Sequence, residues 1–264
     1  MRRHCTASWV CTSCVEGLGF CLFIETLKDD TVSDYLFDPP AIQSLAVRGE
    51  AKRFPIHRLF FVGRNYLAHA EEMGNPIDKA TMRPFYFTKT PQALTPSGAT
   101  VPYPPGTKNF HYEMELVVAI GKPGFRIPAA NAHEHIYGYA AGLDMTRRDL
   151  QLVAREQGRP WDLGKDVEHS AVCTDIMPMP GQVLSDADIS LAVNGVTKQH
   201  SNVSKLIWDI REIIEDLSEF YHLQAGDLIY TGTPEGVGPV VAGDQITGQV
   251  QGVGEIALTL GPAE

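Results

Sequence analysis

The stretch that most constrains the fold runs from residue 111 to residue 121 and reads HYEMELVVAIG. Its second half is aliphatic and β-branched, and a Gly-Lys-Pro-Gly turn follows, which is typical of a buried strand. Side chains alternate between the faces of a strand, so Glu113 and Glu115 point the same way, with His111 beside them. Two carboxylates on one face either raise a pKa or bind a hard cation such as Mg²⁺, Mn²⁺ or Ca²⁺. From these residues alone, an edge strand with two solvated glutamates remains open.

Asp144 adds a third carboxylate. It follows a strand of small residues, 137–143, and lies 29 residues after Glu115 (144 minus 115), a separation that permits a neighbouring strand to return to the same face. Two glutamates and one aspartate make half of an octahedral shell and leave about three positions for water or a chelating substrate. Glu113, Glu115 and Asp144 are therefore candidate ligands for one divalent cation.

The rest of the chain favours short strands joined by turns. Its 264 residues include 24 glycines and 18 prolines, and the expected strands do not alternate regularly with helices, which argues against a parallel doubly wound sheet. We expect helices over about 146–157 and over 203–220, where apolar residues recur at three- and four-residue steps, and a loop over 101–106. The sequence predicts an α+β, mainly β, fold, with residues 1–53 as an N-terminal extension and arm and residues 54–264 as the body.

Charge and cysteine content exclude several classes of protein. The formal net charge is −10 and no Lys/Arg-rich block is present, which argues against nucleic-acid binding. No apolar run approaches the ~20 residues of a membrane span. Cys5, Cys11, Cys14 and Cys21 lie at the N-terminus, where half of a zinc site or a signal peptide is an alternative to the extension without chemistry that we expect. Only Cys173 remains in the body, which favours a reducing compartment, the cytoplasm.

Five motifs in order resemble the fumarylacetoacetate hydrolase family. They are residues 62–74 (VGRNYLAHAEEMG), Glu113-x-Glu115, residues 142–151 (GLDMTRRDLQ), Pro160-Trp161 with Lys165, and residues 231–238 (TGTPEGVG). The match runs from about residue 54 to residue 260. The resemblance implies that residues 54–264 form a catalytic domain, a rolled β-sandwich that is usually dimeric. It also implies that Glu113, Glu115 and Asp144 bind Mg²⁺ or Mn²⁺.

The resemblance further implies hydrolysis of a C–C bond in a small 2,4-diketo acid. Within the family, residues 54–74 are most similar to the fumarylpyruvate hydrolases of gentisate breakdown and to the acylpyruvases, so we expect fumarylpyruvate to yield fumarate and pyruvate. The keto acid would chelate the metal, which stabilises the departing pyruvate enolate. Alternatives on the same metal platform are an acylpyruvase or oxaloacetate decarboxylase, and an isomerase or hydratase. A metal-binding protein without turnover is disfavoured, because it would not need His69, Lys165 and Gln151.

A His-Glu pair is the candidate base. His69 and Glu72 are three residues apart on an expected short helix and face the same way, so Glu72 can orient the ring while His69 takes the proton of the attacking water. Alone, such a pair is more often a surface ion pair. Beside the metal motif we interpret it as a catalytic dyad.

Polar residues of the other motifs are candidates to hold the substrate. Lys165, which we count as catalytic, and Arg148 offer cationic donors for its carboxylates or for the oxyanion at C4, and Gln151 offers an uncharged donor. Arg64 and the Thr233 loop complete the expected substrate-binding set. An acidic stretch, residues 166–168, follows Lys165 where the family has a small or aromatic residue.

Overall fold

The computed structural model describes residues 35–74 and 77–263. The chain divides after Ala41 into two units, and the compact unit that carries the fold begins at Ile42. The cysteine-rich segment lies outside the described residues. Part of the expected arm belongs to the compact unit, because β1 (Ser44–Leu45) pairs antiparallel with β2 (Phe54–Pro55). The functional boundary at residue 54 stays a prediction.

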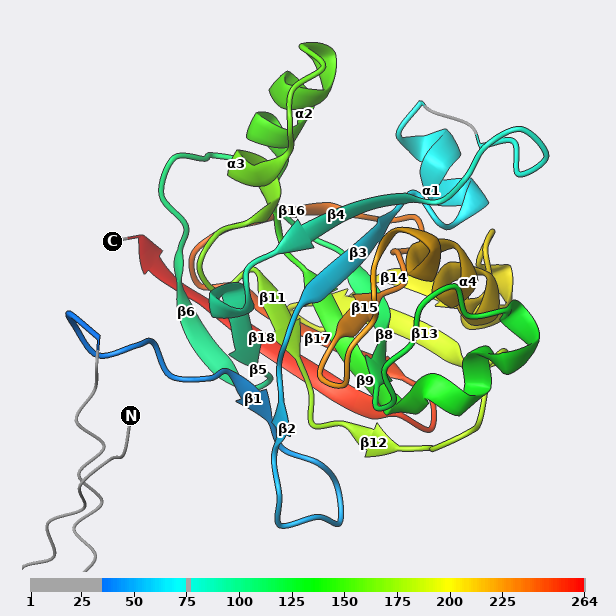
Figure 1. The fold of residues 1–264 in the computed structure, drawn as a ribbon. Helices are drawn as coiled ribbons and strands as arrows, with labels where there is room; N and C mark the ends of the chain where they lie inside the picture. The colour runs from blue at the N-terminus through cyan, green and yellow to red at the C-terminus, as the bar shows by residue number, and fades with distance from the viewer. Residues whose placement is uncertain (1–34, 75–76, 264) are drawn as a thin grey trace, which may run out of the picture. The chain divides into compact units, whose positions relative to one another are not determined.

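Two large sheets pack face to face in the compact unit (Figure 1). The strands of the larger sheet are, in spatial order, β4 (Phe85–Lys89), β3 (Leu59–Gly63), β15 (Leu228–Tyr230), β8 (Met114–Ile120), β9 (Ile136–Asp144), β11 (Ala171–Cys173) and β5 (Leu94–Pro96), with β12 (Met177–Pro178) beside β9. Those of the second sheet are β14 (Val196–Asn202), β13 (Asp188–Val193), β17 (Gln245–Val250), β18 (Gly254–Ala263) and β6 (Ala99–Tyr103). A small sheet contains β10 (Thr146–Arg147), β7 (Phe110–Tyr112) and β16 (Gly238–Val240). The predicted mainly β fold is confirmed.

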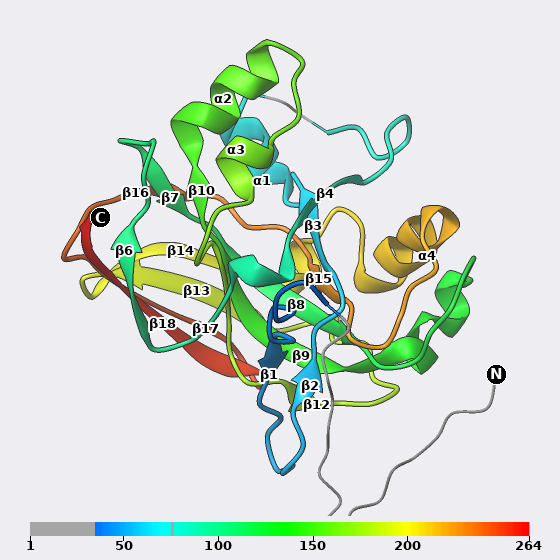
Figure 2. The same cartoon turned by 60° about the vertical axis from the view of Figure 1, so that its left-hand side comes forward.

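The helices of the described part are short. They are α1 (Leu67–Glu72), α2 (Arg148–Glu156), α3 (Asp162–Lys165) and α4 (Ile210–Phe220), with 3₁₀ turns η1 (Pro91–Ala93), η2 (Ala129–His135) and η3 (Val203–Lys205). Figure 1 and Figure 2 show α2 and α3 beside each other, at the same end of the compact unit as α1. Among the described residues, no helix has the length and apolar character needed to cross a membrane.

Two local predictions are wrong. The helix expected over 203–220 begins only at Ile210, because the Asp209 carboxylate accepts the backbone N–H groups of Arg211 and Glu212 and fixes the helix start there. Before that point, the backbone N–H groups of Ile207 and Trp208 donate to Asn65 instead of to a helical turn. The loop expected over 101–106 is partly strand, since β6 pairs parallel with β18.

Strand β8 is buried on both faces and separates two apolar cores. Its even-numbered residues, from Met114 to Ile120, belong to the core that contains residues of both large sheets. Its odd-numbered Val117 and Ala119 belong to a second core together with Phe61. Because side chains alternate, Glu115 lies on the same face as Val117 and Ala119, away from the sandwich interior.

Candidate active site

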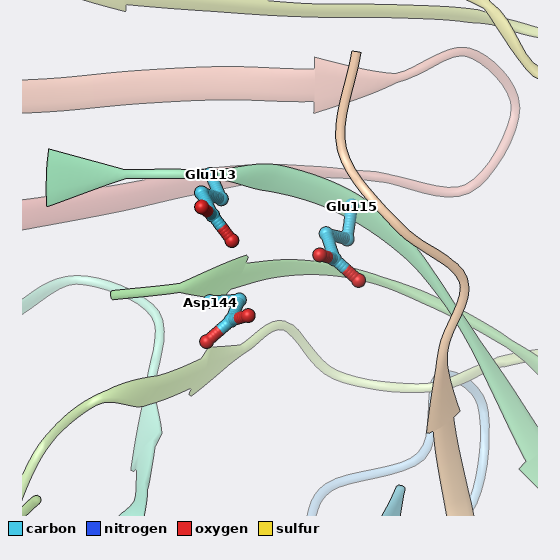
Figure 3. A group of neighbouring side chains, drawn as sticks. All are labelled: Glu113, Glu115 and Asp144. Atoms are coloured by element: carbon cyan, nitrogen blue, oxygen red, sulfur yellow. The ribbon is translucent and has the colours of Figure 1, made fainter. Parts of the chain in front are cut away.

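Three carboxylates from neighbouring strands converge at one end of β8 (Figure 3). Antiparallel pairing places Glu115 opposite Gly142, and the backbone N–H of Asp144 donates to the Glu113 carbonyl at 2.9 Å. Glu113 occupies the one-residue break between β7 and β8. Oxygen atoms of Glu113, Glu115 and Asp144 all lie within 4.8 Å of one another, and the residues are 5%, 2% and 1% exposed.

Buried cations surround two of the carboxylates. Lys165 Nζ donates to Glu113 Oε2 at 2.7 Å, to Asp144 Oδ2 at 2.6 Å and to Thr146 Oγ1 at 2.7 Å, which uses all three of its N–H groups. Arg148 donates to Glu113 as well. Burial alone would raise the pKa of Glu113, but Lys165 and Arg148 hold it well below its usual range.

Lys89 is a further cation in the cluster, and the sequence did not point to it. The ammonium lies 2.7 Å from Asp144 Oδ1 and donates to the carbonyl oxygens of Met145 at 3.0 Å and Ser170 at 2.8 Å. The residue is 3% exposed, and burial lowers its pKa. Lys89 therefore fixes one Asp144 oxygen while Lys165 fixes the other.

No cation of the described residues forms an ion pair with Glu115. Its Oε2 accepts the backbone N–H of Gly232 at 2.8 Å, and Gly232 has φ +98°, a conformation that glycine adopts without strain. Burial, and next the carboxylates of Asp144 and Glu113, raise the pKa of Glu115 well above its usual range. A divalent cation would relieve this repulsion, and an all-oxygen set without thiolates suits Mg²⁺ or Mn²⁺. The residues therefore fit a divalent metal.

The His-Glu pair is present. His69 Nδ1 lies 3.2 Å from Glu72 Oε2, and His69 is 5% exposed. The backbone N–H of Gly236 donates to Glu72 Oε1 at 3.2 Å, so the 231–238 motif holds the carboxylate from the other side. With Nδ1–H donating to Glu72, Nε2 keeps a lone pair and can accept a proton.

One cavity of about 520 Å³ brings the candidates together. Nine of the ten candidate site residues line it, namely Arg64, His69, Glu113, Glu115, Asp144, Arg148, Gln151, Lys165 and Thr233. Glu72, the tenth, does not line the cavity but contacts His69, which does. His111, expected beside the carboxylates, does not line the cavity; its Nε2 lies 2.9 Å from Asn109 Oδ1, while burial and Arg148 lower its pKa to about 4.

Two further details are visible only in the structure. Gln199 is buried, donates to Thr233 Oγ1 at 2.9 Å and accepts the backbone N–H of Met114 at 3.0 Å, so it ties the Thr233 loop to β8. Asp166, the acidic residue that departs from the family pattern, accepts from the Thr90 N–H and hydroxyl at 3.0 and 3.1 Å. The local sequence carries no signal for either contact.

Comparisons with known proteins identify the family. A family profile described as fumarylacetoacetate (FAA) hydrolase C-terminal matches residues 58–260. The chain is 69% identical over 192 residues to the fumarylpyruvate hydrolase of a Ralstonia species, which spans 73% of this chain and 100% of that protein. It is 39% identical over 195 residues to the mitochondrial oxaloacetate tautomerase of Mus musculus, covering 73% and 86% of the two chains. The crystal structure of fumarylpyruvate hydrolase from Pseudomonas aeruginosa in complex with Mn²⁺ and pyruvate is 46% identical, with a TM-score of 0.82 over 87% of this chain and 100% of that one. The chain belongs to the fumarylacetoacetate hydrolase family.

Proposed function

We propose that the chain is a fumarylpyruvate hydrolase, which cleaves the bond between C3 and C4 of fumarylpyruvate to give fumarate and pyruvate. The observation that carries the proposal is one cavity lined both by three buried carboxylates and by a histidine that a glutamate orients. The fumarylpyruvate hydrolase from Ralstonia, and the presence of Mn²⁺ and pyruvate in the structure from Pseudomonas aeruginosa, support it.

We further propose Glu113, Glu115 and Asp144 as the metal ligands, with Mg²⁺ or Mn²⁺ as the ion. When bound there, the ion supplies Lewis-acid polarisation of the keto acid that chelates it. Lys89, Lys165 and Arg148 bring three positive charges to the three carboxylates, so this part of an acidic chain does not repel an acidic substrate.

The remaining residues bind the substrate and move the proton. Arg148 Nη1 donates to Gln151 Oε1 at 3.3 Å, which leaves the Gln151 NH₂ group to donate to the substrate. His69 removes a proton from water as the water oxygen adds to C4. The C3–C4 bond then breaks, its electron pair passes to C3, and C3 takes up a proton to give pyruvate, while C4 becomes a carboxyl carbon of fumarate. One water molecule is consumed: its hydroxide adds to C4, and a proton is delivered to C3.

The finer assignments rest on the family resemblance. We propose that the enzyme takes part in aromatic catabolism of the gentisate type, acts as a homodimer and is cytoplasmic, with residues 54–264 as its catalytic domain. Size-exclusion chromatography with light scattering tests the dimer, since a monomer at assay concentration would contradict it.

Oxaloacetate decarboxylation or tautomerisation is the competing function, because a 39% identical relative is an oxaloacetate tautomerase. Tautomerisation also needs a base, so the His69-Glu72 pair serves either reaction. The higher identity to a fumarylpyruvate hydrolase, 69% against 39%, favours hydrolysis. The test compares fumarylpyruvate, acetylpyruvate and oxaloacetate at equal concentration, with Mg²⁺, with Mn²⁺ and with EDTA. Metal-dependent loss of fumarylpyruvate absorbance at the highest kcat/KM supports the proposal, whereas preference for oxaloacetate contradicts it.

A further inference from the structure

An aromatic wall lines one side of the cavity. It consists of Phe85 and Phe87, two residues apart on β4, and Trp161. The Trp161 ring centroid lies 4.9 Å from that of Phe85 and 6.0 Å from that of Phe87. Gly63 lets Phe85 approach the backbone, because a Cβ at that position would lie 2.5 Å from the Phe85 ring. A flat, conjugated acyl chain can stack on such a wall.

A cation lies over each of the two phenylalanine rings. Lys165 Nζ is 4.9 Å from the Phe87 centroid and contacts the carboxylate cluster. The Arg64 guanidinium is 5.8 Å from the Phe85 centroid. Phe85 and Phe87 are separated by one strand repeat, about 7 Å. The cavity therefore has a cation at the metal end of the wall and another about one strand repeat further along.

Arg64 lacks the anionic partner that a half-buried arginine normally has. Its Nε atom is buried without a hydrogen-bond partner, and no carboxylate of the described residues forms an ion pair with it. Its backbone has φ +57°, an unfavourable conformation for arginine that recurs at binding sites.

A second arginine, Arg155 on α2, lies near Arg64. Burial and this neighbour lower the pKa of Arg64. Arg155 also lines the cavity, and its Nη1 donates to the Met73 carbonyl at 3.4 Å. Neither guanidinium forms an ion pair with a carboxylate of the described residues, so the two together form a ready site for an anion.

We propose that Arg64 and Arg155 bind the distal carboxylate of the acyl group, so that the enzyme selects diketo acids whose acyl part ends in a carboxylate. This inference rests on the proposed function and adds the specificity that the catalytic residues do not provide. A seven-carbon diketo diacid in extended form places its terminal carboxyl carbons roughly 7–8 Å apart, from ordinary bond lengths. That length matches the spacing along the wall, so one carboxylate can reach Arg64 while the keto acid end lies beside Lys165.

The kinetic test compares fumarylpyruvate with acetylpyruvate, which lacks the distal carboxylate. Arg64→Asn removes the guanidinium, and asparagine tolerates a positive φ, so the turn keeps its conformation. Arg155→Gln tests the second cation from a different element. Each variant should lower kcat/KM for fumarylpyruvate by about 10- to 100-fold, as expected for losing a charge-assisted contact, and leave acetylpyruvate within about threefold. Arg64→Lys should recover part of the loss.

Arg126→Asn is the matched control. Arg126 also has a positive φ, +51°, and its guanidinium lies 5.1 Å from the Phe125 ring, but it is exposed and does not line the cavity. Its loss should change neither substrate's kcat/KM. Equal losses for fumarylpyruvate and acetylpyruvate in the Arg64 and Arg155 variants, or no loss for either, would overturn the subsite.

A binding measurement separates this inference from the proposed function. In the Mg²⁺-loaded protein with pyruvate present, calorimetry should detect fumarate binding that is at least tenfold tighter than crotonate binding, and Arg64→Asn should remove the difference. If the wild-type protein binds both acids equally, the subsite is wrong even where fumarylpyruvate is cleaved. If fumarate is preferred but no diketo acid is hydrolysed, the proposed function fails and the anion site stands.

Discussion

Exchanging Glu115 for glutamine should stabilise the metal-free protein and remove the stability that the protein gains when metal is added. In the metal-free protein, Glu115 is buried, faces two other carboxylates and forms no ion pair with a cation in the part of the chain that the structure describes. Its raised pKa means that the folded state loses stability as the pH rises above the ordinary value of 4.5. Each pH unit between 4.5 and the raised pKa costs about 1.4 kcal/mol of stability, so at pH 7 the loss is at most about 3 kcal/mol.

Glutamine keeps the shape and can still accept the Gly232 N–H. In EDTA at pH 7, Glu115→Gln should therefore be more stable than wild type by about 1–3 kcal/mol, which raises Tm by roughly 2–12 °C for a domain of this size. With Mg²⁺ at 100 times Kd, the wild type should gain about 2.7 kcal/mol, or roughly 5–11 °C, and the variant should gain almost nothing. Calorimetric scans in EDTA and in Mg²⁺ measure all four values.

Asp227→Asn is the control for burial of a carboxylate as such. Asp227 is fully buried like Glu115, but Arg58 and His57 pair with it at 2.7 Å each, away from the cavity. Its loss should destabilise the protein by about 3–5 kcal/mol in EDTA and leave the Mg²⁺-dependent gain unchanged. A Glu115→Gln protein that is less stable than wild type in EDTA, or that keeps the full gain with Mg²⁺, would refute the reasoning.

Three other perturbations test the remaining assignments. His69→Gln should keep the Mg²⁺-dependent rise in Tm and the binding of oxalate, a pyruvate analogue, but lose about 10²–10⁴-fold in kcat; turnover equal to wild type would remove the dyad. Lys89→Met leaves Asp144 Oδ1 and the carbonyl oxygens of Met145 and Ser170 without their ammonium partner, so its Tm in EDTA should fall by roughly 5–15 °C; an unchanged Tm would show that no buried ion pair exists there. Deleting residues 1–24 should leave kcat and KM intact, and a large loss of kcat would give that segment a part in the chemistry.

Local patterns predicted the contacts between residues close in the chain or in register. Alternation on a strand put Glu113 and Glu115 on one face, and helical spacing put His69 beside Glu72. Contacts that depend on the packing of distant segments were not predictable. Lys89 is 56 residues from Met145, and Gln199 is 85 from Met114, so only the folded sheets bring them together.

The expected long helix shows how a correct pattern can give a wrong element. The apolar spacing over 203–220 is real, and Val203 and Ile210 are both buried in the same core. The pattern does not reveal that Asn65, far away in the chain, accepts the backbone N–H groups of Ile207 and Trp208. A backbone that is already hydrogen-bonded elsewhere does not form a helical turn, so periodicity predicted the buried face but not the start of the helix.

The register of β8 against β9 links the stability of the fold to the geometry of the site. Pairing of Glu115 with Gly142 places Val117 and Ala119 in one core and Leu116 and its even-numbered neighbours in the other. A slip of one residue would move the carboxylate of Glu115 into the sandwich interior and expose apolar side chains to the cavity. Such a slip would cost the burial of several aliphatic groups at about 1.5–3 kcal/mol each, together with the burial of an unpaired charge. The hydrophobic residues of these strands therefore hold the three carboxylates within 4.8 Å of one another, although none of those residues touches the cavity end that carries them.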